Sequence, residues 1–317
     1  MLLLYQFFPS LKISNMLKNK RPHLIAVLQA VLVTILWSSS WVLIKIGLKD
    51  IPAITFAGIR YFLAFLCLFP FSIFSSKRIN NLKRLKLRDW IRIIILGLLF
   101  ITITQGTIFI GLSLLPAVIV SLLLSSTPFF VTFMGLTLLS EKPAIYQWIG
   151  LILFVCGIFI FFHPVFIPQK QIFGFLIVFI GIFANAGSSL LGRSINKEKV
   201  IQPIIVTIIS MGFGSILLLL FGFSIYGLPK LSLTNWVLIL WLAVINSAFA
   251  FTLWNHTLRT LSAMESSIIN NTMLFQIAIL AWIFFNEAMS IKEIIGMVIA
   301  GSGAIIVQVR YSNDDSK

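Results

Sequence analysis

Charged residues are scarce in this 317-residue chain. Asp, Glu, Lys and Arg make up only 10% of it, whereas 59% of the residues are hydrophobic and 30 are phenylalanine. A water-soluble protein of this length has about a quarter charged residues, because its surface must stay hydrated. The missing charge therefore excludes an ordinary soluble domain and predicts that the lipid bilayer is a partner of the protein.

Cysteine and histidine are also rare. The two cysteines, Cys67 and Cys156, lie in apolar stretches, and the three histidines are scattered. This distribution provides neither a disulfide framework nor the clustered ligands of a metal site. The sequence also lacks the H-E-x-x-H, G-x-S-x-G and P-loop motifs. We therefore predict no metal, no other cofactor and no direct use of ATP by this chain.

Acidic residues are outnumbered by basic ones, 9 against 24, which gives a formal net charge of +15. In a soluble protein such a charge indicates binding to nucleic acid, whereas in a membrane protein it more often determines topology. The positions of the basic residues relative to the membrane spans distinguish these two interpretations.

Ten windows of mostly apolar residues, each long enough to span a bilayer as a helix, follow one another along the chain. Short breaks separate them, and many of these breaks contain proline, which stops a helix or starts one. Ser290 and Glu293 form a capping-box pattern before the last window. The sequence predicts an all-α polytopic membrane protein with ten transmembrane helices at residues 24–46, 53–75, 90–112, 117–138, 144–162, 172–193, 203–224, 235–257, 264–285 and 291–310.

Most of the 24 basic residues fall on one face of this arrangement, which is the face that holds both ends of the chain. The opposite face has Lys49, Lys170, Lys230 and Lys292. By the positive-inside rule, both termini are cytoplasmic. The charge is thus an orientation signal, and no nucleic-acid partner is predicted. The predicted location is the cytoplasmic (inner) membrane of a bacterium.

The chain contains an internal repeat at an offset of 146 residues, which is the distance from Glu141 to Glu287. Apolar matches are expected by chance in such a chain, but serine and glutamate are less common and also fall in register. The matched pairs include Leu112 and Leu258, Ser121 and Ser267, Glu141 and Glu287, Gly150 and Gly296, and Gly157 and Gly303.

Each copy of the repeat contains five predicted spans. Because five is odd, the second copy must enter the membrane in the opposite direction, which makes an inverted repeat of the kind that supports alternating access. The predicted division of the chain is a cytoplasmic N-terminal segment (1–23), a first five-helix repeat (24–162), a second five-helix repeat (172–310) and a cytoplasmic tail (311–317).

Several local patterns resemble the EamA family of the drug/metabolite transporter superfamily. They are Trp37-Ser38-Ser39-Ser40-Trp41 followed by Lys45, Pro52 through Phe56 leading to Arg60, and the junctions at Glu141 and Glu287. The resemblance implies ten helices, a central cavity, and export or exchange of small metabolites such as amino acids. The family often has glycine where this chain has Ser38, so the local pocket shape here is expected to differ.

Polar side chains within the predicted spans indicate where a cavity lies, because an amide or hydroxyl in hydrocarbon needs a partner or water. In the repeat frame Ser125 and Ser126 match Asn271 and Thr272. For a single hydroxyl, hydrogen bonding between helices is the more common role, but the paired cluster favours a cavity. The predicted substrate-binding residues are Trp37, Ser40, Trp41, Gln105, Ser125, Ser126, Asn185, Asn246, Asn270, Asn271 and Gln276.

The first span places Trp37, Trp41 and Lys45 on one helical face. A substrate can stack on the two indoles while its carboxylate or phosphate approaches Lys45, although an aromatic belt with a snorkelling lysine fits the pattern equally well. Arg60 and Tyr61, early in the second span, are predicted to complete an anion-attracting gate. Contact with lipid headgroups is the alternative for this pair.

Apart from Glu293, which belongs to the capping box that opens the last span, Glu265 is the one carboxylate that the prediction places inside a span. It is a candidate to carry a coupled proton, but it also suits the positive end of the ninth helix and can pair with Arg259. Glu141 and Glu287 are expected to stabilise the starts of the fifth and tenth helices.

The main functional hypothesis is a secondary transporter that moves a small polar or amphipathic metabolite through a cavity between the repeats. An intramembrane enzyme is a weaker alternative, because no nucleophile and base, paired carboxylates or metal ligands are evident at membrane depth. A membrane scaffold without flux is a second alternative, but it does not explain the duplicated polar cluster.

Overall fold

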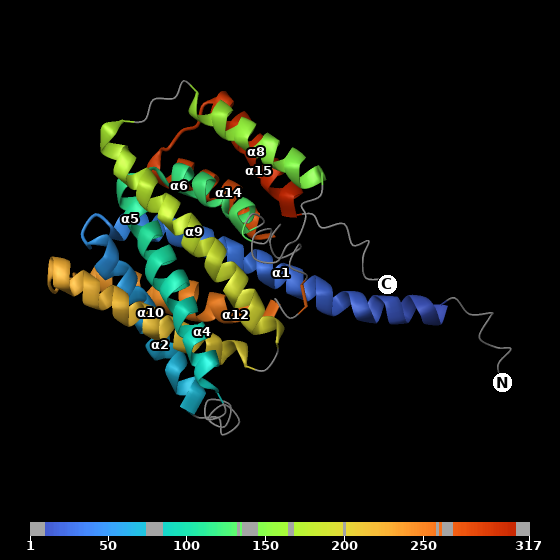
Figure 1. Ribbon diagram of the computed structural model, residues 1–317, viewed down its shortest axis with the longest axis horizontal. Helices are drawn as coiled ribbons and strands as arrows, with labels where there is room; N and C mark the ends of the chain where they lie inside the picture. The colour runs from blue at the N-terminus through green and yellow to red at the C-terminus, as the bar shows by residue number, and fades with distance from the viewer. Residues whose placement is uncertain are drawn as a thin grey trace.

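The computed structural model describes residues 10–73, 85–131, 134, 145–163, 168–198, 201–257, 260–261 and 269–308. All regular structure in these ranges is helical (Figure 1). The elements are α1 (Ser10–Gly47), α2 (Ala53–Ile73), α4 (Leu87–Gly97), η1 (Leu98–Gln105), α5 (Gly106–Leu114), α6 (Ala117–Leu124), α8 (Ile145–Phe162), α9 (Gln169–Lys197), α10 (Pro203–Tyr226), α11 (Leu233–Trp241), η2 (Leu242–Phe249), α12 (Ala250–Thr257), α14 (Met273–Phe285) and α15 (Ile291–Gln308).

Six helices in the described part of the chain are long and apolar enough to cross a membrane, and three shorter apolar helices accompany them. The prediction of an all-α polytopic membrane protein is therefore confirmed. The six are His23–Gly47, Ala53–Pro70, Leu87–Leu114, Gln169–Asn196, Pro203–Tyr226 and Leu233–Trp254, and the shorter ones are Ala117–Val131, Trp148–Phe162 and Ile269–Phe285.

The helix ends follow local chemistry. Pro116 precedes the first residue of α6, and Pro203 is the first residue of α10, where a missing N–H has no cost. Ser232 caps α11 by accepting a hydrogen bond from a backbone N–H at 3.2 Å. The predicted capping box of α15 is confirmed, because Glu293 N–H donates to Ser290 Oγ and Ser290 N–H donates to the Glu293 carboxylate.

Two of the long helices contain a π-helical segment in the middle. One runs through α4, η1 and α5, and the other through α11, η2 and α12. They occupy the third and eighth predicted spans, which are corresponding positions in the two halves of the chain. A π-helical segment shifts the side chains that follow it around the helix and is common at functional sites. The segment η1 lines the cavity described below through Gln105, and η2 contacts the lining residue Arg60 through Ser247.

Helices α8 and α15 pack with their backbones in contact (Figure 1). A Cβ atom added to Gly157 would lie 2.6 Å from the carbonyl oxygen of Gly296, and one added to Gly303 would lie 2.5 Å from that of Gly150. In the sequence repeat Gly157 matches Gly303 and Gly150 matches Gly296. Exchanging the two halves therefore converts each of these contacts into the other.

Several other helix pairs show the same correspondence. α2 packs on α10, which are the second spans of the two halves. α1 packs on η2 and α12, just as α9 packs on η1 and α5. α1 also packs on α14, just as α9 packs on α6. Similarly, α2 packs on η2 as α10 packs on η1.

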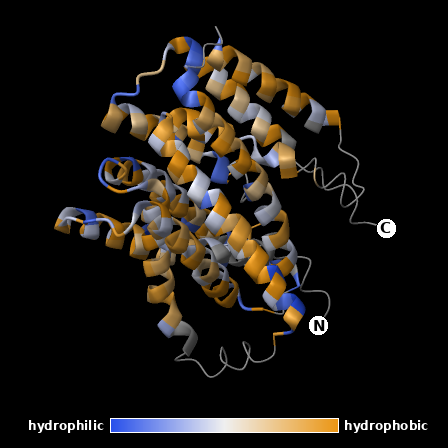
Figure 2. Cartoon of the chain, turned by 60° about the vertical axis from the view of Figure 1, so that its left-hand side comes forward, coloured by the Kyte–Doolittle hydropathy of each residue, from blue (hydrophilic) through white to orange (hydrophobic). Residues whose placement is uncertain are grey.

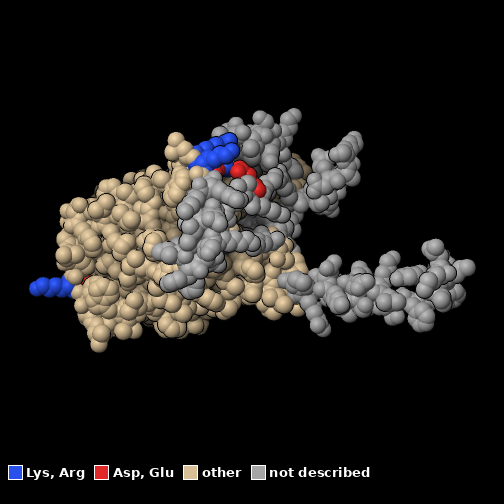
Figure 3. Space-filling view, turned by 90° about the horizontal axis from the view of Figure 1, so that it is seen from below, with Lys and Arg blue, Asp and Glu red and all other residues tan. Residues whose placement is uncertain are grey.

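The outward side chains of these helices are large and apolar. Leu28, Ile35, Ile152 and Leu176 are among many that are exposed, and the orange of hydrophobic residues predominates along the helices in Figure 2. On the face drawn in Figure 3, the described charged residues lie at the edges, and the broad surface between them is uncharged. Many serine and threonine side chains, together with Asn235 and Asn246, are instead buried inside. This distribution is typical of a protein with hydrocarbon as its solvent.

Candidate functional site

A cavity of about 170 Å³ lies between the two halves of the chain. Its walls come from α1, α2, η1, α5 and α6 in the first half, and from α9, α12, α14 and the turn before α14 in the second. Sites for drug-sized ligands have volumes of about 300–1,000 Å³. The cavity therefore fits a small metabolite better than a large drug.

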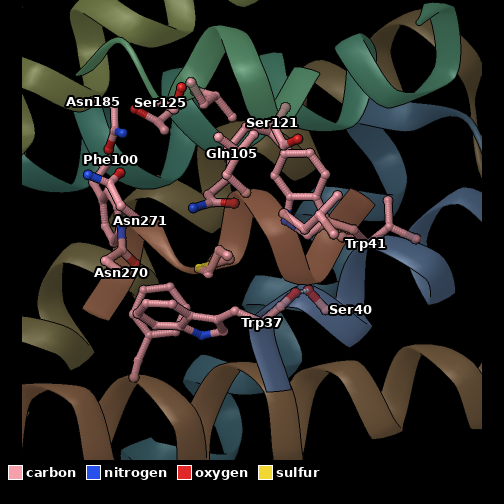
Figure 4. Close-up of a pocket in the computed structure, with 18 of the residues that line it drawn as sticks. Trp37, Ser40, Trp41, Phe100, Gln105, Ser121, Ser125, Asn185, Asn270 and Asn271 are labelled. Carbon is pink, nitrogen blue, oxygen red and sulfur yellow. Dashed lines mark hydrogen bonds between the residues drawn. The ribbon is translucent and has the colours of Figure 1, made fainter. Parts of the chain in front are cut away.

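The cavity brings together ten of the residues that the sequence predicts for binding or gating. They come from several helices. Those labelled in Figure 4 lie around one space, with the amides of Asn185, Asn270 and Asn271 toward one end of the view and Trp41 and Ser40 toward the other. The ten residues are Trp37, Ser40, Trp41, Arg60, Tyr61, Gln105, Ser125, Asn185, Asn270 and Asn271.

Aromatic rings form one wall of the cavity. The ring of Trp37 lies 5.0 Å from that of Phe251 and 5.2 Å from that of Trp254, centroid to centroid. Phe251 also contacts the rings of Tyr61 and Phe100, at 6.4 Å and 5.6 Å. Tilted and edge-on contacts of this kind hold aromatic side chains in place. The wall therefore offers a rigid apolar surface for the body of a substrate.

Hydroxyl and amide groups form the polar part of the lining. Pro128 has no N–H, so the carbonyl of Leu124 loses its helical partner, and the Thr127 hydroxyl donates to it instead at 2.7 Å. The same Thr127 oxygen accepts a hydrogen bond from Asn185 Nδ2 at 3.2 Å. The break in the helix after α6 thus orients a cavity amide from α9. Asn270, just before α14, is the exposed member of this group.

Arg60 lies in the interior at the cavity wall, with only 2% of its surface exposed. Its Nε donates a hydrogen bond to Ser247 Oγ in η2 at 2.9 Å. The guanidinium carbon lies 5.1 Å from the ring centroid of Tyr61 and 5.9 Å from that of Phe109. Contact with lipid headgroups, the alternative considered for Arg60 and Tyr61, does not fit this burial.

Three predicted substrate-binding residues lie outside the cavity lining. Asn246 is fully buried and its Nδ2 donates to the carbonyl of Leu36. Gln276 accepts a hydrogen bond from Ser38 Oγ at 2.8 Å. The hydroxyl of Ser126 donates to a backbone carbonyl of its own helix, three residues back. Asn246 and Gln276 therefore join α1 to η2 and to α14, which is the helix-to-helix role that the sequence could not separate from binding.

Lys45 does not face the cavity but forms an ion pair with Glu287. The Glu287 carboxylate also accepts the backbone N–H of Ala117 at 3.1 Å, and Ala117 is the first residue of α6. Glu287 was expected to stabilise the start of its own helix, α15. That expectation is wrong, because Glu293 performs this role and Glu287 stabilises the start of α6.

Some expectations fall outside what the structure describes. Glu265, the candidate for a coupled proton, and Glu141 lie outside the described residues. Within the described ranges, no three His, Cys, Asp or Glu residues come together in a way that could hold a metal ion.

The sequence prediction missed several residues that line the cavity. Phe100 and Phe251 belong to a set of 30 phenylalanines, so their type alone carried no signal. Ser121 and Thr104 also line it. Ser121 had a usable signal, because it matches Ser267 in the internal repeat.

A helical membrane protein built from two corresponding halves around a partly polar cavity belongs, by its architecture, to the class of membrane transporters. The comparison with protein families agrees with this class. The EamA-like transporter family matches residues 24–163 and 172–309. The chain therefore belongs to the EamA-like transporter family, and the resemblance inferred from the sequence is confirmed.

Curated relatives carry transporter names. The chain is 26% identical over 288 residues to the "Uncharacterized transporter YoaV" of Bacillus subtilis, covering 88% of this chain and 95% of that protein. It is 24% identical to the "Probable amino-acid metabolite efflux pump" of Escherichia coli, covering 71% and 75%. One crystal structure matches with a TM-score of 0.65 at 15% identity, over 89% of this chain and 96% of that one, which shows a shared fold.

Proposed function

We propose that the protein is a secondary transporter, an exporter or exchanger, of a small amphipathic metabolite such as an amino acid or a related compound. The observation that carries this proposal is the cavity between the two halves, with an aromatic wall, amide groups and one guanidinium. A relative named as a probable amino-acid metabolite efflux pump supports the same substrate size and class.

The proposed architecture has ten spans in two inverted repeats, residues 24–162 and 172–310, flanked by the segments 1–23 and 311–317. The exchange of glycine contacts between α8 and α15 supports it, since a two-fold axis in the membrane plane relates antiparallel helices in this way. Both termini are cytoplasmic in a bacterial inner membrane, as the distribution of basic residues favours. In alternating access, the two halves rock about the cavity.

In this orientation Lys45, Glu287 and Ala117 lie at the outer end of the bundle. Their contacts join α1, the connection between α14 and α15, and the start of α6. The cavity residues Ser40 and Ser121 are buried below these contacts. The proposed role of Lys45 is therefore to close the outer end, and Glu265 stays a candidate for the coupling site.

An intramembrane enzyme is the less favoured alternative. The three lining serines, Ser40, Ser121 and Ser125, each donate their hydroxyl to a backbone carbonyl three residues back. Among the described residues that line the cavity, there is no histidine or carboxylate to activate them. A nucleophile needs such a base within hydrogen-bond reach.

Transport in reconstituted vesicles tests the proposed function, with a panel of amino acids, nucleotide-like compounds and cationic drugs. We expect flux of at least one member, and about tenfold lower flux when Trp41→Ala removes an aromatic surface or Asn270→Ala removes a polar contact. Trp148→Ala is the matched control, because Trp148 is exposed on α8. No flux of any member contradicts the transporter, and unchanged flux in both variants contradicts the pocket.

The proposed topology makes a separate prediction. Tags at both ends of the chain are expected to resist protease added to intact cells and to be cleaved after the membrane is opened. This result follows from an even number of spans with the basic face inside. Cleavage of only one tag in intact cells would rule out an even span count and with it the inverted repeat.

A further inference from the structure

Arg60 supplies the only charge at the cavity among the residues described there. The other lining side chains are aromatic, aliphatic, hydroxyl or amide groups, and none is an aspartate, glutamate, lysine or histidine. Arg60 itself is buried in α2, on the second span of the first half. The described part of the cavity wall thus carries one fixed positive charge.

The described part of the chain provides no carboxylate within 4.0 Å of this guanidinium. Within the described residues, its side chain donates a hydrogen bond from Nε to Ser247 Oγ. The rings of Tyr61 and Phe109 stabilise the cation in part. A buried cation without a counter-ion is costly, and a guanidinium has five N–H donors, of which Nε supplies one. The terminal nitrogens suit a bidentate contact with a carboxylate.

Two other N–H groups at the cavity lack acceptors within the described structure. Trp37 Nε1 and Asn271 Nδ2 are buried, belong to lining residues, and have no protein partner in the described structure. Buried N–H groups need acceptors. An anionic ligand supplies acceptor oxygens, whereas an ammonium group supplies only more donors.

We propose that Arg60 binds the anionic group of the transported compound, which is therefore a small amphipathic carboxylate. Its apolar body lies against Trp37 and the aromatic wall. The described lining offers no carboxylate for an ammonium group, so a carboxylate without an amine binds at least as well as the corresponding amino acid. That the compound is transported rests on the proposed function, whereas its binding at Arg60 does not depend on transport.

Binding to the purified full-length protein, measured by titration calorimetry, tests this site without any need for flux. The probes are matched sets that share a body and differ in the end group: indole-3-propionate, tryptophan, tryptamine and indole-3-propanamide, with 3-phenylpropionate and butyrate sets for smaller bodies. We expect at least one carboxylate to bind about ten- to hundredfold more tightly than the amine of the same set. Tighter binding of the amines, or no binding of any carboxylate, overturns the proposal.

Variants separate recognition by Arg60 from a structural role through Ser247. Arg60→Gln is expected to weaken carboxylate binding about ten- to hundredfold while binding of the neutral amide is kept. Arg60→Lys keeps the charge without the bidentate geometry, so its carboxylate affinity is expected to lie between those of the parent and Arg60→Gln. If Arg60→Gln does not fold, the affinities of Arg60→Lys for the carboxylate and for the amide still test whether Arg60 recognises the carboxylate. Equal carboxylate affinity in the variants and the parent overturns the proposal.

The same probes distinguish this inference from the proposed function. If carboxylate binding depends on Arg60 but no flux occurs in vesicles, the proposed transport function is contradicted and the proposed anion site is supported. If cations are transported but no carboxylate binds, the proposed anion site is contradicted and the proposed transport function is supported.

Discussion

Gly157→Ala is expected to destabilise the protein by about 1–3 kcal/mol, the usual cost of overpacking a tight contact. The added methyl group would meet the backbone of α15, with the oxygen of Gly296 at 2.6 Å and the Cα of Ala300 at 2.8 Å. Backbone atoms cannot rotate away as a side chain does, so α8 and α15 must separate. Close approach at small residues is a main source of helix association in membranes, where burial of apolar surface gives little.

The measurement is the temperature at which half of the detergent-solubilised protein loses its monodisperse peak. Gly303→Ala is expected to show a loss similar to that of Gly157→Ala, because the two positions are equivalent in the proposed repeat. Gly187→Ala in α9 is the control, since its Cβ would lie 3.5 Å from a leucine methyl group, an ordinary contact. Stability unchanged from the parent in both variants would show that this contact is not tight in the membrane protein.

The glycine contact shows which parts of the fold the sequence could predict. The repeat frame matched Gly150 with Gly296 and Gly157 with Gly303 before any contact was known. It could not tell that α8 packs on α15, because helix partners are chosen in three dimensions. Apolar windows did locate most helices, because the length and composition of a span are set by the bilayer and not by the neighbouring helices.

The candidate site was harder to predict, because the faces of a membrane helix carry a weak signal. In a soluble helix the polar face is the outer one, whereas lipid and protein interior are both apolar. Asn271 at the cavity and Gln276 in a helix contact therefore looked alike in the sequence. The hydrogen bond from Ser38 to Gln276 distinguishes them only once α1 and α14 are placed together.

The depth of Arg60 in the bundle was not evident from the sequence, for a simpler geometric reason. The sequence places Arg60 early in its span on the outer side, where it predicts an anion-attracting gate, with headgroup contact as the alternative. α2 begins at Ala53, so at about 1.5 Å per residue Arg60 lies roughly 10 Å along the helix axis. At that depth it is beside η2, whose Ser247 accepts its hydrogen bond. The π-helical segment that presents Ser247 left no recognisable pattern in the sequence.

Loss of the ion pair between Lys45 and Glu287 is expected to open the outer end of the cavity. Lys45→Ala removes one charge of the pair, and Glu287→Gln also weakens the acceptor for the N–H of Ala117. Hydrogen bonds to charged groups contribute about 1.5–3 kcal/mol, so either change shifts the balance between closed and open states by about tenfold or more. Phe285 also contacts Lys45, with its ring centroid 5.1 Å from Nζ.

The opening is measured by a cysteine placed in the cavity. Ser40→Cys is suitable because Ser40 lines the cavity and is only 3% exposed, after Cys67 and Cys156 have been replaced by serine. We expect a membrane-impermeant thiol reagent outside right-side-out vesicles to label it about tenfold faster in either variant. Lys49→Ala is the control, because Lys49 is exposed and belongs to no ion pair in the described residues.

The charge swap Lys45→Glu with Glu287→Lys gives the sharpest form of this prediction. It restores opposite charges across the contact, but a lysine cannot accept the N–H of Ala117 and places a positive charge at the start of α6. Labelling is therefore expected to fall between the parent and the single variants. Full restoration would show that the ion pair alone closes the outer end, and labelling equal to the parent in Lys45→Ala would show that the pair closes nothing.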